Sequence, residues 1–548
     1  MRGYINTRYG LMPSIQSIAI YMESLVIKGR ATELKVLIID DSRPAAVLVR
    51  QQLVSMGLHR DNVYSVVRYE DALPLLDKYF FHLLIIDYHL EQALNGFELV
   101  SVLHQNRRLN DKVGILIISG DATQQTVLTA LSGKVKHFIS KPIKTRHLEE
   151  KIDQILGEIE LKEALGPLLP IERFDILKQA LNQPVHPRFA IAHEALILDD
   201  LMSNANVLLL KEALTQSQTS NHATKAIAQA VVLQHHGEVG SAIELLHQFL
   251  IENPLSIRIL DQLSLLYQEN HNHPMALKWA IKAFELTPSI SKRAIRASFL
   301  AAQLKQKETL VKIGYTFAGH ISLADQNWLN AVLSYLNDLG SVYTATDQNK
   351  SKKLLLKHTS NFAQVALRRL TPQRIAQLNA AVTLFQTHIL LHEQNPFLAH
   401  QKLFKSLSFF YQDIFACPSL LLEQYINSFL YFGEFHMHKE LQQINQQHQS
   451  TKCAQAEFVN DAVTPPNDIH DLEVHLQQYP YSAEAKMHYM HRAQNKLKNN
   501  KQTHQYRDEL NQLHLPPNWG RWLKIHQHRA PLTAPPTAFS ISTPAEPL

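Results

Sequence analysis

Cysteine is scarce in this chain, because only Cys417 and Cys453 occur among its 548 residues. This excludes a scaffold built on several disulfides and suits a reducing compartment. No uninterrupted apolar run reaches the roughly 18 residues that a membrane-spanning helix requires. The apolar stretch 14–27 is interrupted by Glu23 and lacks a small-residue cleavage site, so it does not fit a signal peptide. We therefore expect a cytoplasmic protein without membrane insertion, in which residues 1–32 are a poorly ordered leader.

Glycine is rare after residue 167, where only seven occur and none forms a cluster that could cradle a phosphate. Walker, G-x-G-x-x-G and G-x-S-x-G patterns are absent from this part of the chain. We also find no DNA-reading helix-turn-helix with a basic recognition helix and no motif of a cyclic-dinucleotide enzyme. The long C-terminal part therefore gives no sign of chemistry, and we expect no separate enzymatic effector.

The N-terminal part contains four short apolar runs, each of which ends in polar residues. The first ends at the pair Asp40–Asp41, and the others end at Asp87, Ser119 and Lys141. Short apolar runs separated by helix-length segments are typical of buried parallel strands in a βα repeat. Because ligands in such sheets bind at the carboxyl ends of the strands, we expect these polar side chains to gather at one edge.

The residue types at these strand ends predict a site for a divalent metal and a phosphoryl group. Three crowded carboxylates repel one another, and Mg²⁺, which prefers oxygen ligands, relieves that repulsion. With the metal bound, the Asp87 carboxylate can act as a nucleophile toward a phosphoryl donor. Lys141 supplies a compact positive charge, and the Ser119 hydroxyl can donate a hydrogen bond to a phosphoryl oxygen.

This constellation, within residues 33–156, resembles the receiver domain of two-component response regulators, a CheY-like α/β domain with a flavodoxin-like sheet. The resemblance implies that Asp87 is the phosphoacceptor and that Asp40 and Asp41 hold Mg²⁺ together with it. It assigns further roles to four positions: Ser119 is the switch hydroxyl, Phe138 the rotameric aromatic, Lys141–Pro142 the Lys–Pro pair whose peptide bond is usually cis, and His89 the residue that offers its backbone carbonyl to the metal.

The loop after Asp87 departs from the family pattern. The family often has a proline four residues after the phosphoacceptor and a glycine eight residues after it, whereas here Glu91 replaces the proline and Gly96 lies nine residues on. The loop is therefore one residue longer than the commonest form. A degenerate receiver that keeps the fold without phosphorylation is the alternative, but such domains typically lose the acceptor, an acidic residue or the lysine. All of these are present here.

Beyond residue 157 the strand pattern gives way to helical periodicity with a repeat of 34 residues. Small residues recur where two antiparallel helices would approach closely, and larger ones recur along the seam between them. The first copy contains Ala226, Ala230, Leu233, Ala242, Leu246, Phe249 and Pro254, and the second contains Leu260, Ser264, Tyr267, Ala276, Ala280, Ala283 and Pro288. This pattern resembles the tetratricopeptide repeat. The clearest copies are 222–255 and 256–289. His271, where the first copy has Gly237, is a departure, and a third unit after Pro288 is weaker.

The patterns together predict two folded regions and three less ordered segments. We expect a leader at 1–32, the receiver domain at 33–156, a linker at 157–170, an all-α array of tetratricopeptide-like repeats at 171–512, and a Pro-rich tail at 513–548 that is disordered from about residue 530.

Charge is distributed too evenly to indicate a nucleic-acid surface. The net charge of the chain is +5, but residues 31–156 carry fifteen Lys/Arg and fifteen Asp/Glu, and residues 1–30 carry +3. Only +2 is left for the remaining 392 residues, whereas nucleic-acid binding normally requires a concentrated basic surface. The one local basic excess, in 484–529, is better interpreted as solvated helix faces.

Histidine is abundant, with 30 residues in the chain. Some lie close together in sequence and look like metal-binding pairs: His235–His236, His271–His273 and His436–His438. None has an acidic or cysteine companion at a convincing ligand spacing, so we interpret them as polar surface histidines rather than a zinc site.

We therefore predict a response regulator that is phosphorylated on Asp87 by a histidine kinase or a phosphotransfer protein. Its helical array would bind a protein or peptide partner, and a homodimer formed through the receiver is left open. The alternative is a nucleic-acid-binding regulator that uses the basic segment 484–529. A third hypothesis is an enzymatic effector too divergent to recognise.

Overall fold

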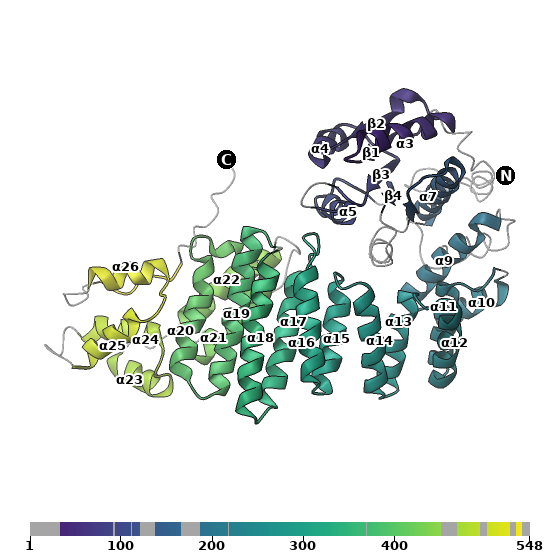
Figure 1. Cartoon of the computed structure of the whole chain (residues 1–548). Helices are drawn as coiled ribbons and strands as arrows, with labels where there is room; N and C mark the ends of the chain where they lie inside the picture. Colours follow the sequence, from purple (N-terminus) through teal and green to yellow (C-terminus); the bar gives the residue numbers. More distant parts are fainter. Residues whose placement is uncertain are drawn as a thin grey trace, which may run out of the picture. The chain divides into compact units, whose positions relative to one another are not determined.

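The computed structural model shown in Figure 1 describes residues 33–90, 94–110, 112–120, 137–165, 187–217, 219–368, 370–450, 468–493, 501–526 and 533–539. The predicted leader, Glu91 and Cys453 lie outside these residues. The described residues form two compact units, one made of those up to 300 together with 322–325, and the other made of 301–321 together with those from 326 onward.

A five-stranded parallel sheet forms the N-terminal part of the first unit. Its strands are β1 (Val36–Ile39), β2 (Val63–Val66), β3 (Leu83–Asp87), β4 (Gly114–Ser119) and β5 (His137–Ser140). They lie in the order β2-β1-β3-β4-β5, and every neighbouring pair is parallel. Every residue of β1, β3 and β4 is buried, which explains their continuous apolar runs. The strand order reverses between β1 and β3, and open sheets of this kind bind ligands at that crevice.

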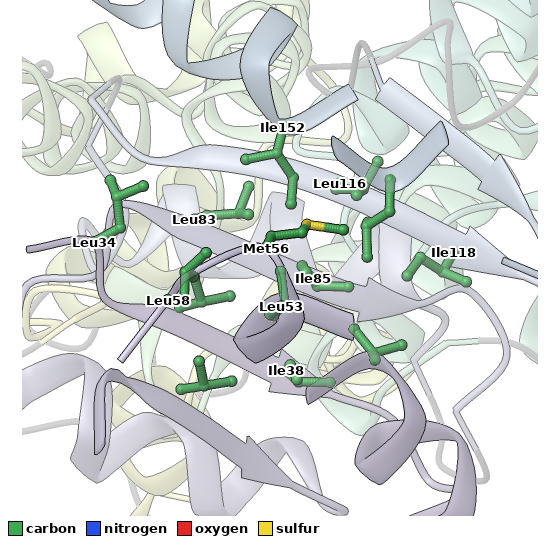
Figure 2. Close-up of a cluster of buried hydrophobic side chains, with 14 of the residues drawn as sticks. Leu34, Ile38, Leu53, Met56, Leu58, Leu83, Ile85, Leu116, Ile118 and Ile152 are labelled. Carbon is green, nitrogen blue, oxygen red and sulfur yellow. The ribbon is translucent and has the colours of Figure 1, made fainter. Parts of the chain in front are cut away.

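Helices supply the side chains that bury the two faces of this sheet. They are α3 (Arg43–Ser55), α4 (Tyr69–Lys78), α5 (Gly96–Gln105) and α7 (Thr145–Leu165), with a short 3₁₀ turn, η1 (Arg60–Asn62). Figure 2 shows one buried cluster, in which Leu53 of α3 and Ile152 of α7 lie beside Ile38, Leu83 and Leu116 of the strands. The opposite cluster joins α4 and α5 to Leu37, Leu84 and Ile117. The predicted CheY-like α/β fold is confirmed.

The predicted linker 157–170 is partly helical, because α7 continues to Leu165. The linker residues of this helix remain at least partly buried as far as residue 159. Residues 166–170, which include the expected Gly-Pro hinge, lie outside the described residues.

The described residues beyond 186 contain helices and no strand, which confirms the prediction of an all-α region for that part of the chain. The helices are α9 (Pro187–Ser203), α10 (Val207–Gln216), α11 (Ala223–His235), α12 (Val239–Glu252), α13 (Ile257–Glu269), α14 (His273–Leu286), α15 (Ser291–Gln303), α16 (Lys307–His320), α17 (Trp328–Thr344), α18 (Asn349–Leu367), α19 (Pro372–His392), α20 (Pro396–Leu407), α21 (Ser419–Tyr431), α22 (Phe435–Ser450), α23 (Ile469–Gln478), α24 (Ala483–Arg492), α25 (Lys501–Asn511) and α26 (Pro517–Ile525), with 3₁₀ turns η2 (Ser408–Phe410) and η3 (Ile414–Ala416).

Helix boundaries repeat with the 34-residue period expected from the side chains. Helices α13 and α14 each begin and end 34 residues after α11 and α12, respectively. Helices α15 and α16 keep the same offset from α13 and α14. The third repeat, formed by α15 and α16, therefore has the same helix boundaries as the first two, although its side chains fit the sequence pattern less well.

The turns inside the three helix pairs share one backbone conformation. Gly237, His271 and Lys305 are each 34 residues apart, and all three have positive φ, at 81°, 56° and 54°. Glycine tolerates this left-handed conformation best, and other residues adopt it at helix ends at some cost. His271 thus has the same kind of backbone conformation as Gly237 and differs from it only in residue type.

The small residues of the repeat lie in the seams between paired helices. Ala230, Ala242, Ser264 and Ala276 are fully buried, and the Ser264 hydroxyl donates to the carbonyl of Ala276 at 2.9 Å. Helices α11 and α12 pack against each other, as do α13 and α14. The other predicted packing residues follow the same plan: Ala280 is buried, Leu233 and Tyr267 are half-buried, and Pro254 and Pro288 lie between helices.

The prediction of a tail that is disordered from about residue 530 is wrong for residues 533–539. The indole N–H groups of Trp519 and Trp522 donate to the carbonyls of Pro536 and Thr533, at 2.9 and 3.0 Å. The side chain of Phe539 is buried. Composition favoured disorder here, but the backbone carbonyls of this segment accept hydrogen bonds from the two tryptophans of α26.

In the part of the chain that the structure describes, none of the helices is long and apolar enough to cross a membrane.

Candidate active site at the carboxyl edge of the sheet

Three carboxylates meet where β1 and β3 end. Asp40 and Asp41 directly follow β1, and Asp87 is the last residue of β3. Because these two strands are neighbours in parallel register, their carboxyl ends lie at one edge of the sheet. One oxygen of each carboxylate lies within 4.8 Å of the others. Asp40 and Asp87 are buried, at 3% and 7% exposure, so water cannot fully screen their mutual repulsion.

Lys141 bridges two of these carboxylates. Its Nζ donates to Oδ2 of Asp40 and to Oδ2 of Asp87, at 3.0 Å each. Burial acts to lower the pKa of Lys141, but the hydrogen bonds to the two carboxylates raise it overall, so the ammonium stays charged. The peptide bond between Lys141 and Pro142 is cis, as the resemblance implied.

Backbone hydrogen bonds at the ends of β3 and β4 hold the site residues beside one another. The N–H of Lys141 donates to the carbonyl of Ser119 at 2.8 Å, and the N–H of Tyr88 donates to the carbonyl of Ile118 at 2.7 Å. Ser119 is fully buried at the end of β4. The sheet therefore brings the hydroxyl, the ammonium and the carboxylates to one edge, as predicted from the strand ends.

Asp87 is held in an environment that disfavours its charge. Burial is the largest cause of a raised pKa for this carboxyl, and the nearby charges of Asp40 and Asp41 act in the same direction. The hydrogen bond and charge of Lys141 oppose the shift without cancelling it. A further cation close to Asp87 would therefore stabilise the charged form of this carboxylate.

The residues present fit a divalent cation bound by oxygen. Oδ1 of Asp87 is buried and accepts no hydrogen bond from the residues that the structure describes, although Oδ2 is bound by Lys141. A single ammonium cannot neutralise three carboxylates, so the cluster retains negative charge. A hard cation such as Mg²⁺ would use Asp87 Oδ1 with Asp40 and Asp41 and would offset that charge. The role of the His89 backbone carbonyl, two residues beyond β3, stays a prediction.

Asp40 also helps to set the start of the next helix. Its Oδ1 accepts the N–H of Ser42 at 2.9 Å, and Ser42 is the N-cap of α3. Pro44 occupies the first turn of this helix, where a missing N–H costs nothing. The acidic pair is therefore fixed between a buried strand and a capped helix.

Gly96 is a site residue whose role the sequence did not reveal. A Cβ at this position would lie 2.3 Å from the carbonyl oxygen of Asp87, and the N–H of Gly96 donates to the carbonyl of Tyr88 at 2.8 Å. The longer loop after Asp87 thus returns so that α5 begins against the backbone of the acceptor. Only glycine allows this close approach.

Phe138 lies on β5, where its half-buried ring packs against the cluster that contains Leu37, Leu84 and Ile117. An aromatic side chain that is neither fully buried nor fully exposed has room to change rotamer. Its assignment as the switch aromatic stays a prediction.

Comparisons with known proteins agree with this geometry. Residues 36–153 match the response regulator receiver domain family. A CheY chemotaxis protein homolog from Campylobacter jejuni is 29% identical over 125 residues, which are 23% of this chain and 93% of that protein. The chemotaxis protein CheY-3 of Vibrio cholerae is 26% identical over 138 residues, which are 25% of this chain and 100% of that protein. A CheY-like receiver domain structure from Methanospirillum hungatei is 27% identical and covers 23% of this chain and 98% of that chain, with a TM-score of 0.21.

Proposed function

Residues 36–153 are a CheY-like response regulator receiver domain, and from this premise we propose that the chain is a phosphorelay regulator that acts through protein contacts of its helical region. A receiver domain implies an interaction with a phosphodonor, which is a histidine kinase or a phosphotransfer protein. The observation that carries the proposal is the buried Asp87 carboxylate, which lies beside Asp40 and Asp41 and is bridged by Lys141.

In the proposed reaction, a carboxylate oxygen of Asp87 attacks the phosphorus of the donor. A new oxygen–phosphorus bond forms, and the bond to the donor atom breaks with its electron pair going to the donor. Mg²⁺, held by Asp40, Asp41, Asp87 and the His89 carbonyl, would offset charge on the transferring oxygens. Lys141 holds the Asp87 carboxylate through Oδ2 and so fixes its orientation.

The proposed switch follows from the same geometry. The Ser119 hydroxyl would donate a hydrogen bond to a phosphoryl oxygen on Asp87. The Phe138 ring would then turn inward. A phosphoryl group can shift the protein between two arrangements only by as much as it favours one of them. We propose that this shift changes how the helical region meets its partner, and we propose no separate enzymatic effector.

A groove in the second unit supports the proposal that the helical region holds a peptide. A cavity of about 650 Å³ lies against α17, α19 and α21. Its lining combines apolar side chains such as Phe385 and Ile389 with amides and hydroxyls such as Asn330, Asn337 and Ser341. Apolar pockets give a peptide affinity, and neutral polar groups can pair with its backbone.

The alternative of nucleic-acid binding finds less support in the basic segment 484–529. Lys486 is buried and pairs with Glu509 at 2.7 Å, so its charge is not presented to a phosphate backbone. We expect the full chain to show no salt-dependent retention on heparin beyond that of a neutral protein. Tight, salt-sensitive binding of DNA or RNA, with no protein partner recovered, would instead favour the alternative.

The experiment that tests the proposed function is labelling with acetyl phosphate and Mg²⁺, followed by mass spectrometry. We expect one acid-stable, hydroxylamine-labile phosphoryl group, and we expect Asp87→Asn to remove it. Asp61→Asn is the matched control, because the Asp61 side chain is 85% exposed on η1. Undiminished labelling of Asp87→Asn would show that the acceptor is another residue.

A further inference from the structure

Three potential metal ligands converge between two helices of the second unit, far in sequence from the receiver domain. His436 lies in the first turn of α22, and Glu484 and His488 lie one turn apart on α24. One ligand atom from each residue lies within 4.8 Å of the other two. No local pattern in the sequence marks this cluster, because Glu484 and His488 lie 48 and 52 residues beyond His436.

The Glu484 carboxylate is fixed in place by the start of α22. Its Oε2 accepts the N–H groups of His436 and Met437, at 2.9 and 3.4 Å. Its Oε1 pairs with Nδ1 of His436. In return, Oε2 of Glu434 accepts the N–H of Glu484 at 2.9 Å, at the start of α24. The two helix starts thus cap each other, and this holds the carboxylate in one orientation.

The two imidazoles lie close to each other and to this carboxylate. The ring centroids of His436 and His488 are 5.6 Å apart.

A cavity of about 250 Å³ opens beside the three ligands. Its other walls come from α22, from Trp519 of α26, and from Pro535 and Pro536 of the tail segment. That segment is held by the Trp519 indole and by Glu440, which accepts the N–H groups of Ala538 and Phe539 at 3.1 and 3.0 Å. The cavity leaves room for a water molecule as a fourth ligand.

We propose that His436, Glu484 and His488 form a binding site for a divalent transition-metal ion of the zinc type. Two imidazoles and one carboxylate are a donor set that suits Zn²⁺, whereas Mg²⁺ prefers oxygen ligands alone. Three protein ligands with an adjoining cavity match a site that keeps one position for water. The ion would link α22 to α24 at the cavity that Pro535 and Pro536 also line. The proposal does not depend on the proposed function of the receiver domain.

The test is a titration of the metal-depleted full chain with Zn²⁺ and with Co²⁺, in the presence of excess Mg²⁺ to occupy the acidic pocket. We expect one equivalent of Zn²⁺ to bind, and Co²⁺ to give the intense visible absorption of a four-coordinate site. Loss of an outer-sphere partner alone typically weakens a metal site 10–100-fold, so His488→Gln, which removes a ligand, should weaken Zn²⁺ binding by at least about 100-fold. His470→Gln is the matched control, because His470 is an exposed histidine on α23.

A second variant keeps the test decisive if His488→Gln folds poorly. Glu484→Gln keeps an acceptor for the α22 N–H groups while it removes the anionic ligand, and we expect the same loss of Zn²⁺ affinity. Zn²⁺ should also raise the unfolding midpoint of the wild type and leave that of both variants unchanged. Binding below one equivalent, or equal affinity in His488→Gln and the wild type, would show that the pair His436–Glu484 is a structural cap alone.

Discussion

The acidic cluster of the receiver domain and the His436–Glu484–His488 cluster of the second unit differ in how the chain assembles them. The first comes from the ends of adjacent parallel strands, and all of its ligands are oxygens. The second joins a helix start to one face of another helix, and two of its three ligands are nitrogens. Strand order therefore gathers the first cluster, whereas only the detailed packing of helix ends gathers the second.

The two clusters should also bind different ions, and only the ion of the acidic cluster should affect the labelling of Asp87. The rate of this labelling gives the largest expected effect. Removing Mg²⁺, or replacing Asp41 by Ala, should slow labelling by acetyl phosphate at least about 100-fold, because the charge on the transferring oxygens is no longer offset. His488→Gln should label at the wild-type rate. Rates followed by mass spectrometry would separate the clusters, and a slow His488→Gln variant would break the comparison.

This contrast explains which parts of the molecule could be predicted from the sequence. Asp40, Asp87, Ser119 and Lys141 each lie at the carboxyl end of a short parallel strand, so their convergence follows from the parallel strands alone. Gly96 was visible only as an unusual loop length, because a close approach between backbones has no residue pattern of its own. The 34-residue period of the helical region was also visible, since small residues must recur where helices meet.

Other features depend on contacts between residues far apart in sequence. The reciprocal caps of Glu434 and Glu484 join helix starts nearly fifty residues apart, and no local pattern marks them. The ordered segment 533–539 has the composition of a disordered tail, and its contacts with Trp519, Trp522 and Glu440 fix it. Such long-range contacts need the fold before they can be recognised.

The next largest effect concerns the backbone beside the acceptor. Gly96→Ala would place a Cβ 2.3 Å from the carbonyl oxygen of Asp87, so α5 must shift. We expect a cost of about 1–3 kcal/mol in the unfolding free energy of the receiver domain, together with slower labelling of Asp87. Gly120→Ala is the control, since no atom of the described residues lies within 4 Å of a Cβ there. Equal denaturant midpoints for the two variants would contradict the close approach.

A loss of stability of similar size, without any effect on the labelling of Asp87, is expected from overpacking in the helical region. Ala230→Leu should overpack the seam between α11 and α12 and cost about 1–3 kcal/mol. Gln248→Leu adds a side chain of the same kind at an exposed position of α12 and should have little effect. Hydrogen exchange of the amides in α11 and α12 measures the change locally. Unaltered exchange in Ala230→Leu would mean that the seam is looser than described.

The smallest expected effect is the pH dependence of Asp87. Its folded-state pKa is raised, chiefly by burial, so its contribution to stability is full below the unfolded-state pKa and is lost as pH rises through the folded-state value. Without Mg²⁺ at neutral pH, Asp87→Asn should therefore unfold at a slightly higher temperature than the wild type, and the difference should shrink in acid. Mg²⁺ should stabilise the wild type more than the variant. A less stable Asp87→Asn protein without Mg²⁺ would be the opposite result.

The most direct test of the central claim is the affinity of the full chain for a protein recovered with it, measured with and without phosphorylation of Asp87. Coupling between two sites is typically worth 1–3 kcal/mol, so we predict a change of about 5–150-fold. Phe138→Ala and Lys141→Ala should reduce that change while they leave the affinity of the unphosphorylated chain intact. Equal affinity of the fully phosphorylated and unphosphorylated protein would contradict the claim that the receiver domain controls the helical region.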